Sequence, residues 1–309
     1  MIVVPDDFPS VFESSEAHAR ARALGEVHVH TARGAEDEAE LSRRIGNATV
    51  AVNIRAYARF TEAVFRACPG LKMISIWGTG TDNVDLAAAA HRGVTVCNTP
   101  GVNAHAVAEH TMALMLAVAR RIPGIDREMR SGAWPRDMLA QLDGKTLAVF
   151  GSGAIGARVA QLARGFGMEV LTWSARGGTP AAKDDCLRRA DFATLHLRLV
   201  PETQGFIGRR EFALMKPGAY LVNTGRGALV DRDALIEALA SRRIAGAGLD
   251  VFHEEPVKSG DPLLASPYTV LSPHNAGQTP EVRRDGLLAA IENVERFLSG
   301  APINLVRTR

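Results

Sequence analysis

The sequence predicts an α/β protein built from two doubly wound units. Short runs of β-branched and other apolar residues recur along the chain, with helix-like segments between them. Strands that are apolar on both faces are typical of parallel sheets covered by helices. The chain has 309 residues, of which 46% are hydrophobic, and this length exceeds what one hydrophobic core usually serves. A single eight-stranded barrel is the alternative, but it has too few strands and gives no reason for a glycine-rich loop in mid-chain.

The predicted strands fall into two series. The first series comprises Ile2–Val4, Val27–His30, Thr49–Ile54, Lys72–Ile76 and Val94–Asn98. The second series comprises Thr146–Phe150, Glu169–Trp173, Phe192–Leu197, Ala219–Asn223, Ala247–Val251 and Thr269–Leu271. The regular alternation of strand and helix within each series favours one parallel sheet in each unit.

Three further segments indicate how the units are connected. Asn103–Arg121 is apolar on nearly every face and predicts a buried helix. Pro123–Gln141 contains two prolines and two glycines and predicts a connector. Glu281–Leu298 is amphipathic, and we expect a helix that packs back on the first unit and makes that unit discontinuous. The expected domains are residues 1–100 with 276–309, and residues 101–275.

The composition excludes several classes of protein. With 36 Lys and Arg against 34 Asp and Glu, the net charge of +2 creates no field that would attract nucleic acid or an anionic membrane. Three widely spaced cysteines fit neither a disulfide framework nor a thiolate metal cluster. The longest apolar run, Met112–Ala119, is far shorter than the roughly 20 residues of a membrane helix. The N-terminus lacks the pattern of a signal peptide, so we expect a cytoplasmic protein.

No metal site is expected. His105 and His110 lie with Glu109 on the predicted buried helix. Their i, i+5 spacing does not place both imidazoles on one face, as the i, i+4 pair of a zinc motif does. Core, capping or interface roles are therefore expected for these histidines.

A glycine-rich loop follows the first strand of the second series. Its sequence matches G-x-G-x-x-G between a predicted strand and a predicted helix, Ala157–Gly165. In this context the first glycine makes the tight turn, the second lets the backbone approach a pyrophosphate, and the third lets the helix pack closely on the strand. A plain strand-helix turn is the alternative. We expect a Rossmann dinucleotide-binding domain, whose loop contacts the cofactor through Gly151, Gly153, Ala154, Ile155 and Gly156.

The end of the next strand indicates which dinucleotide is bound. An NAD site usually carries an acidic residue about 20 residues after the loop, which accepts hydrogen bonds from the ribose. Here the strand ends in Trp173-Ser174-Ala175-Arg176, without a carboxylate. Ser174 can donate to a 2′-phosphate and Arg176 can neutralise it, so the sequence favours NADP(H) over NAD(H). Arg176 as a solvated loop cation is the alternative.

Polar side chains follow three later strands of the second series, namely Arg226, Glu255 and His274. Ligands of open α/β sheets bind outside the carboxyl ends of the strands, so these three side chains are expected to converge beside a nicotinamide. An arginine clamps a carboxylate, a histidine exchanges a proton at a carbinol oxygen, and an acid keeps the histidine charged and oriented. Glu254 is the rival of Glu255, but adjacent side chains do not share a direction.

With these residues the chain resembles the D-isomer-specific 2-hydroxyacid dehydrogenase family, which includes glyoxylate/hydroxypyruvate reductases and phosphoglycerate dehydrogenases. The resemblance covers nearly the whole chain and implies a flavodoxin-like first domain that closes on the nucleotide domain through a hinge. Many members have a proline two residues after His196, where this chain has Arg198. Further matching motifs are Gly78-Thr79-Gly80-Thr81-Asp82-Asn83-Val84-Asp85, Asn98-Thr99-Pro100-Gly101-Val102-Asn103, Ala106-Val107-Ala108-Glu109-His110 and Met215-Lys216-Pro217-Gly218.

The resemblance also implies how the substrate is bound. Arg226 would bind the substrate carboxylate and polarise the 2-oxo group. His274 would be the acid/base, with Glu255 as its partner. The backbone of Thr79 and Gly80 would cradle the carboxylate. Arg55 lies where some members use a substrate-binding arginine.

For the cofactor, the resemblance implies that Asp250 and the carbonyl of Thr224 hold the nicotinamide carboxamide, and that Leu197 and Gly277 also line the site. The activity it implies is hydride transfer between NAD(P)H and C2 of a small 2-oxo acid, such as glyoxylate or hydroxypyruvate, to give the D-2-hydroxy acid. It also implies a homodimer. The alternative is a dinucleotide-dependent scaffold of the corepressor type with little turnover, although such proteins carry tails beyond this core.

Overall fold

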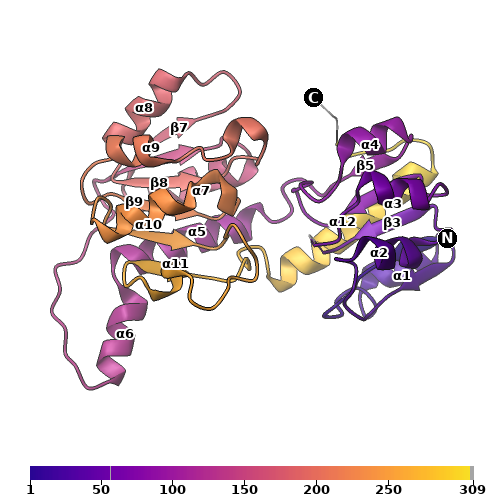
Figure 1. Ribbon diagram of the computed structural model, residues 1–309, viewed down its shortest axis with the longest axis horizontal. Coiled ribbons are helices and arrows are strands. Elements are labelled where there is room, and N and C mark those ends of the chain that lie inside the picture. The colour runs from indigo at the N-terminus through magenta and orange to yellow at the C-terminus, as the bar shows by residue number, and fades with distance from the viewer. Residues whose placement is uncertain (56, 307–309) are drawn as a thin grey trace. The chain divides into compact units, whose positions relative to one another are not determined.

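The computed structural model describes residues 1–55 and 57–306, and these form two compact units (Figure 1). Unit 1 comprises Met1–Asn103 together with the segment that begins at Gln278. Unit 2 comprises Ala104–Gly277. Residues 307–309 of the expected first domain lie outside the described residues.

Unit 1 is built on a five-stranded parallel sheet. Its strands are β1 (Ile2–Val4), β2 (Val27–Val29), β3 (Val50–Asn53), β4 (Met73–Ile76) and β5 (Thr95–Cys97). Their order, β2-β1-β3-β4-β5, is the flavodoxin-like order that the family resemblance implies. The helices are α1 (Glu16–Arg22), α2 (Glu38–Ile45), α3 (Glu62–Ala67), α4 (Leu86–His91) and α12 (Pro280–Leu298).

Helix α12 returns from the far end of the sequence and completes unit 1. Its apolar face packs on the sheet, and Ser75 on β4 donates a hydrogen bond to the carbonyl of Ala290 at 2.7 Å. Asn293, which is fully buried, donates to the carbonyl of Asn98 at 2.9 Å and so ties the helix to the end of β5. Because buried amides cost free energy unless they are paired, these contacts fix the helix in one register.

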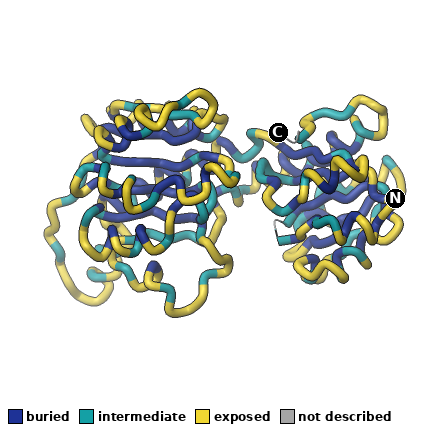
Figure 2. The backbone as a smooth tube through the Cα atoms, turned by 45° about the horizontal axis from the view of Figure 1, so that its top comes forward, coloured by how far each residue is buried: buried dark blue, intermediate teal, exposed yellow. Residues whose placement is uncertain are grey.

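Unit 2 is built on a six-stranded parallel sheet. Its strands are β6 (Thr146–Phe150), β7 (Glu169–Trp173), β8 (Phe192–Leu195), β9 (Tyr220–Asn223), β10 (Gly246–Leu249) and β11 (Thr269–Leu271). They lie in the order β11-β10-β9-β8-β6-β7. The direction of winding reverses at β6, so the crevice beside the carboxyl end of β6 is the switch point at which such sheets bind ligands. The inner strands of both sheets are almost entirely buried and dark blue in Figure 2, as predicted, whereas the edge strands β2, β7 and β11 contain no buried residue.

The helices of unit 2 cover both faces of its sheet and include two short 3₁₀ turns. They are α5 (Ala104–Ala119), α6 (Ile122–Arg130), α7 (Ala154–Gly165), α8 (Pro180–Arg189), α9 (Arg209–Leu214), α10 (Arg232–Ala240) and α11 (Pro262–Ala265), with η1 (Pro201–Thr203) and η2 (Gly227–Leu229). Most residues of α5 are buried, as its uniform apolar pattern predicts. The helix lies close to β10, where a Cβ on Gly248 would be 3.0 Å from the Cβ of Leu114.

Pro123–Gln141, expected as a connector between the units, lies inside unit 2, and its first part is helical because α6 occupies residues 122–130. Pro123 is the second residue of this helix, where its missing N–H has no intrahelical partner to lose. The proline is therefore compatible with the start of a helix. No helix among the residues that the structure describes is long and apolar enough to cross a membrane.

Candidate active site

Every residue singled out in unit 2 lies at, or just beyond, the carboxyl end of a strand. The glycine loop follows β6, Ser174 and Arg176 follow β7, and Leu197 follows β8. Thr224 and Arg226 follow β9, Asp250 and Glu255 follow β10, and His274 and Gly277 follow β11. Because all six strands are parallel, these segments share one edge of the sheet.

The glycine loop has the geometry of an anion-binding turn. Gly151 has φ of +114°, and a Cβ at this position would lie 2.4 Å from the carbonyl oxygen of His196. A Cβ on Gly156 would lie 1.8 Å from the carbonyl oxygen of Gly151, so only glycine lets α7 start this close to the strand. Helix α7 begins at Ala154 without a side-chain cap, and its first N–H groups therefore face the space beyond the loop.

His196 lies beside this loop at the end of β8. Both ring nitrogens are buried and have no hydrogen-bond partner among the described residues. Burial lowers the pKa of His196 to about 4, so the ring is neutral at physiological pH. An orphaned imidazole beside a glycine cradle and an uncapped helix start fits the binding of a dinucleotide at this edge.

The segment after β7 carries Ser174 and Arg176, the two residues expected to bind a 2′-phosphate on the ribose. The hydroxyl of Ser174 accepts a hydrogen bond from the main-chain N–H of Arg176 at 3.2 Å. The Arg176 side chain is exposed and has no ion-pair partner among the residues described. Leu197, on the other side of the glycine loop, is buried.

His274 and Glu255 form a direct pair. Nδ1 of His274 lies 2.6 Å from Oε2 of Glu255. The other carboxylate oxygen, Oε1, accepts the main-chain N–H of Phe252 at 2.9 Å. A carboxylate only accepts, so Nδ1 carries a proton in this contact, and Nε2 is the nitrogen left to face a ligand. Glu254 instead pairs with Lys258 at 2.7 Å, which leaves Glu255 as the partner of the histidine.

The charge on Glu255 is stabilised by its surroundings. Partial burial raises the pKa of the carboxyl group, but the hydrogen bonds from His274 and Phe252 lower it. The positive charges of His274 and Arg226 lower it further, and the net result is a pKa below its ordinary 4.5. The charge of Arg226 thus acts on the same carboxylate, and the three predicted residues lie together.

Close backbone packing holds the arginine segment against the glutamate segment. A Cβ on Gly227 would lie 2.1 Å from the carbonyl carbon and oxygen of Phe252, so a larger residue would push the two loops apart. Asn223, buried at the end of β9, donates to the carbonyl of Arg226 at 2.9 Å and accepts the N–H of Gly225 at 3.0 Å. The turn that carries Arg226 is therefore fixed at both ends.

Asp250 is buried, and its carboxylate accepts hydrogen bonds from three groups of the protein. Its Oδ1 accepts the Ser272 hydroxyl at 2.6 Å and the N–H of Asn275 at 3.0 Å, while Oδ2 accepts the N–H of Ala276 at 3.0 Å. A carboxylate has about four acceptor directions, so about one remains, on Oδ2, for a carboxamide. Thr224 is buried as well, with its hydroxyl 2.9 Å from that of Thr111 on α5.

The remaining candidates belong to unit 1. Thr79 and Gly80 follow β4 in a loop held by two buried side chains: Asn98 donates to the carbonyl of Thr79 at 2.8 Å, and Thr99 accepts the N–H of Gly78 at 2.8 Å. The N–H groups of Thr79 and Gly80 have no acceptor in the part of the chain that the structure describes. The loop therefore presents two free donors, as a carboxylate cradle requires.

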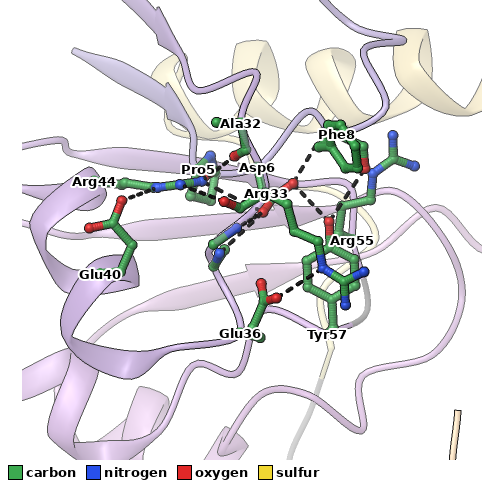
Figure 3. A network of polar contacts seen from close by, with 12 residues as sticks. Pro5, Asp6, Phe8, Ala32, Arg33, Glu36, Glu40, Arg44, Arg55 and Tyr57 are labelled. Atoms are coloured by element: carbon green, nitrogen blue, oxygen red, sulfur yellow. Dashed lines mark hydrogen bonds and ion pairs between the residues drawn. The ribbon is translucent and has the colours of Figure 1, made fainter. Parts of the chain in front are cut away.

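Arg55 follows β3, the neighbour of β4 in this sheet, and its side chain is directed onto the loop after β1. Figure 3 shows Arg55 beside Phe8 and Tyr57, and its guanidinium donates to the carbonyl of Pro9. Its Nε is buried without a partner among the described residues. Binding a substrate through this guanidinium would require it to leave Pro9, which the sequence did not indicate.

A buried carboxylate organises the loops around Arg55. Asp6 accepts the hydroxyl of Tyr57 at 2.8 Å and the N–H groups of Gly34 and Ala35 at 3.0 and 3.1 Å (Figure 3). Arg44 lies 3.6 Å away and supplies the counter-charge. Burial and the hydrogen bond to Asp6 raise the pKa of Tyr57, so its hydroxyl stays protonated. This network joins the loops after β1, β2 and β3.

Two residues of the site were not assigned a role from the sequence. Ser272 donates to the Asp250 carboxylate, and His110 contacts the hydroxyl of Ser272. His110 and Ser272 are 162 positions apart in the sequence, so only the folded structure shows that they are in contact. A serine directly before the Pro273-His274 pair was the only local signal. Among the described residues, no group of three or more His, Cys, Asp or Glu side chains is arranged to hold a metal ion.

The geometry predicts the titration of Glu255. The carboxyl ¹³C resonance of this residue should titrate with a midpoint below 4.5, because the ion pair and the Phe252 N–H favour the charged form. The variant His274→Ala removes one donor and one charge, so the midpoint should rise. A midpoint at or above 4.5 in the unmodified protein would show that the pair does not form.

Comparison with known proteins places this arrangement in a family. A family model described as "D-isomer specific 2-hydroxyacid dehydrogenase, NAD binding domain" matches residues 112–276. The chain is 42% identical over 257 residues to a glyoxylate reductase from Aeropyrum pernix, a match that covers 77% of this chain and 77% of that enzyme. It is 31% identical over 300 residues to a hydroxypyruvate reductase from Blautia hydrogenotrophica, with 92% of each chain covered.

A solved structure extends the likeness to the whole fold. An acyclic imino acid reductase in complex with NADPH and D-Arg superposes with a TM-score of 0.91 at 27% identity, covering 99% of this chain and 99% of that chain. The chain therefore belongs to the D-isomer-specific 2-hydroxyacid dehydrogenase family, whose members exchange a hydride between a nicotinamide dinucleotide and C2 of a 2-oxo acid.

Proposed function

We propose that this protein is an NADPH-dependent reductase that converts a short 2-oxo acid, glyoxylate or hydroxypyruvate, into the D-2-hydroxy acid. The main support for the proposal is the His274–Glu255 pair, in which Nδ1 and Oε2 are 2.6 Å apart. The positive charge of Arg226 lowers the pKa of the same glutamate. All three residues lie at the edge of the sheet where the glycine loop is found. The names of the two relatives, a glyoxylate reductase and a hydroxypyruvate reductase, support the substrate class.

Arg226 and His274 have complementary parts in this reaction. Arg226 binds the substrate carboxylate through its fork of N–H donors and polarises the 2-oxo group. His274, with Nδ1 held by Glu255, directs Nε2 at the oxo oxygen and donates the proton that turns it into a hydroxyl. Glu255 stabilises the protonated imidazole before this transfer. In the oxidation direction the same nitrogen receives the proton.

The two units have separate parts. Unit 2 is the nucleotide-binding domain, in which Gly151, Gly153, Ala154, Ile155 and Gly156 hold the pyrophosphate and Thr224, Asp250, Leu197 and Gly277 surround the nicotinamide and adenosine. The bound dinucleotide supplies the hydride that C2 receives. Unit 1 is the substrate domain, in which the free N–H groups of Thr79 and Gly80 bind the carboxylate. Arg55 contributes only when it leaves the carbonyl of Pro9.

Spectrophotometry tests this function directly. Loss of NADPH absorbance is followed with glyoxylate, hydroxypyruvate, pyruvate and a phenyl-substituted 2-oxo acid, and NADH is run in parallel. Glyoxylate or hydroxypyruvate should be turned over fastest. The variant Arg226→Lys keeps the charge but loses the bidentate fork, so its kcat/KM should fall by about 100-fold or more. Absence of turnover by protein that binds NADPH would favour the corepressor-type scaffold, and near-normal kinetics of Arg226→Lys would remove Arg226 from the site.

The preference for NADPH is proposed from Ser174 and Arg176. Arg176 is exposed at the end of β7 without an ion-pair partner among the described residues, and a 2′-phosphate would supply one. The solved neighbour that binds NADPH supports the same choice. No carboxylate stands at the end of β7 to repel that phosphate.

Substitution of Arg176 separates the two cofactors. Arg176→Ala should raise KM for NADPH by about tenfold or more, since a charge-assisted hydrogen bond contributes about 1.5–3 kcal/mol, and should leave KM for NADH within about twofold. Arg164→Ala, an exposed arginine in the last turn of α7, is the matched control. Equal effects on both cofactors would disprove a contact between Arg176 and the 2′-phosphate.

We also propose that the protein is a cytoplasmic homodimer that pairs through α6 and the segment after it. Helix α6 buries none of its residues and projects from the rest of unit 2 in Figure 1. Ile122, Met129, Trp134 and Met138 are exposed there, Trp134 by 72%. Such a concentration of large apolar side chains is typical of an interface.

Sedimentation equilibrium checks this assembly. The unmodified protein should sediment as a dimer, and Trp134→Asp combined with Met138→Asp should weaken the association by at least about tenfold, because two apolar contacts become buried charges. Phe166→Asp, which charges an exposed apolar residue at the end of α7, is the control. A monomeric protein, or a dimer that tolerates both charges, would show that this surface does not pair.

A further inference from the structure

A chain of three polar groups links helix α5 to the turn that carries His274. Nε2 of His110 lies 2.8 Å from the hydroxyl of Ser272, and that hydroxyl lies 2.6 Å from Oδ1 of Asp250. The direct distance from Nε2 of His110 to Oδ1 of Asp250 is 3.5 Å. The three residues come from α5, the end of β11 and the end of β10, so these hydrogen bonds connect three elements of unit 2.

Chemistry fixes the direction of these hydrogen bonds. The carboxylate of Asp250 can only accept, so the single hydroxyl proton of Ser272 is donated to Oδ1. The hydroxyl oxygen must then accept from His110, which requires a proton on Nε2 of that histidine. Each bond in such a row polarises the next, and the row ends on the buried negative charge.

The same carboxylate holds the backbone of the His274 turn. The carboxylate accepts the N–H groups of Asn275 and Ala276 at 3.0 Å each, and the main-chain carbonyl of Asp250 accepts the N–H of His274 at 2.7 Å. His274 itself has φ of +52°, in the left-handed region that non-glycine residues rarely adopt. A residue in this region stays there only when its surroundings impose it.

We propose that His110 and Ser272 are positioning residues for the acid/base His274. They orient the Asp250 carboxylate, which imposes the left-handed turn and so directs Nε2 of His274 while Nδ1 remains on Glu255. This inference rests on the proposed role of His274. It assigns a task in the reaction to a helix-borne histidine that acts on His274 through Ser272 and Asp250.

The hydrogen bonds, and not the volume of the side chains, perform this task. Ser272 is half-buried, and its hydroxyl contacts His110 and Asp250. Threonine keeps this hydroxyl, whereas alanine removes it with the loss of one atom. Glutamine at position 110 keeps an N–H donor without an imidazole, whereas alanine keeps none.

Steady-state kinetics with NADPH and glyoxylate test the proposal. Ser272→Ala and His110→Ala should lower kcat by about 10- to 100-fold, because a proton donor displaced by about an ångström loses that much rate. KM for glyoxylate and the Kd for NADPH, measured by fluorescence, should stay within about threefold. Ser272→Thr and His110→Gln should recover most of kcat. His105→Ala, an exposed histidine on the same helix, is the control and should match the unmodified enzyme.

Hydrogen exchange gives a readout that does not depend on activity. The amides of Asn275 and Ala276 should exchange faster in Ser272→Ala than in Ser272→Thr, because the carboxylate that accepts them is no longer held. If Ser272→Ala fails to fold, His110→Ala carries the same comparison against His110→Gln.

Three results would overturn the inference. They are unchanged kcat in the alanine variants, equal losses in the alanine and the conservative variants, and unchanged exchange of the two amides. Failure of the proposed function is recognised separately, because the unmodified protein would then show no turnover; failure of the proposed role of His274 would appear as unchanged turnover in His274→Ala. Loss of turnover in His274→Ala with normal kinetics in Ser272→Ala and His110→Ala would contradict the positioning role alone.

Discussion

The constraint on which the rest of this site depends is the buried carboxylate of Asp250. Its Oδ1 accepts the Ser272 hydroxyl and the main-chain N–H of Asn275, and its Oδ2 accepts the N–H of Ala276, the next residue of the turn after β11. Buried charges are costly unless hydrogen bonds satisfy them, so the turn cannot move without leaving this charge unpaired. The position of His274 is therefore set by a residue from a different strand, and the contact with Glu255 can form at a single orientation of the ring.

The parallel sheet supplies the second condition. Each of its strands delivers a loop to the same edge, and the loops are pressed together by close backbone contacts at which only glycine fits, as at Gly156 and Gly227. An arginine, a glutamate and a histidine that are far apart in the sequence thereby lie beside a dinucleotide loop. Unit 1 also presents a loop at the end of a strand. The loop after β4 is fixed by hydrogen bonds with Asn98 and Thr99, and the N–H groups of Thr79 and Gly80 remain available for a carboxylate.

Much of this could be predicted from the sequence because it depends on local pattern. Buried strands, the glycine loop and the amphipathic C-terminal helix each have a characteristic order of residues, and the strand-end rule then brought Arg226, Glu255 and His274 together. The family motifs added Thr79 and Gly80. In each case neighbouring residues carry the information.

What escaped prediction depends on contacts between distant segments. Pro123 and Gly124 predict a connector, but both lie in the first turn of α6. The direction of Arg55 depends on the loop after β1, which lies 46 positions away in the sequence. The hydrogen bonds from His110 through Ser272 to Asp250 require α5, β10 and β11 to pack together. The spacing of these residues in the sequence does not predict that packing.

A crystal structure with NADPH and oxamate, an unreactive analogue of a 2-oxo acid, would test the proposed arrangement of the site. The oxamate carboxylate should lie on the Arg226 guanidinium, and its carbonyl oxygen should be within hydrogen-bond distance of Nε2 of His274. Nδ1 should remain on Glu255, and the amides of Asn275 and Ala276 should remain on Asp250. Oxamate bound away from Arg226, or a His274 ring turned from the ligand while its turn is intact, would contradict it.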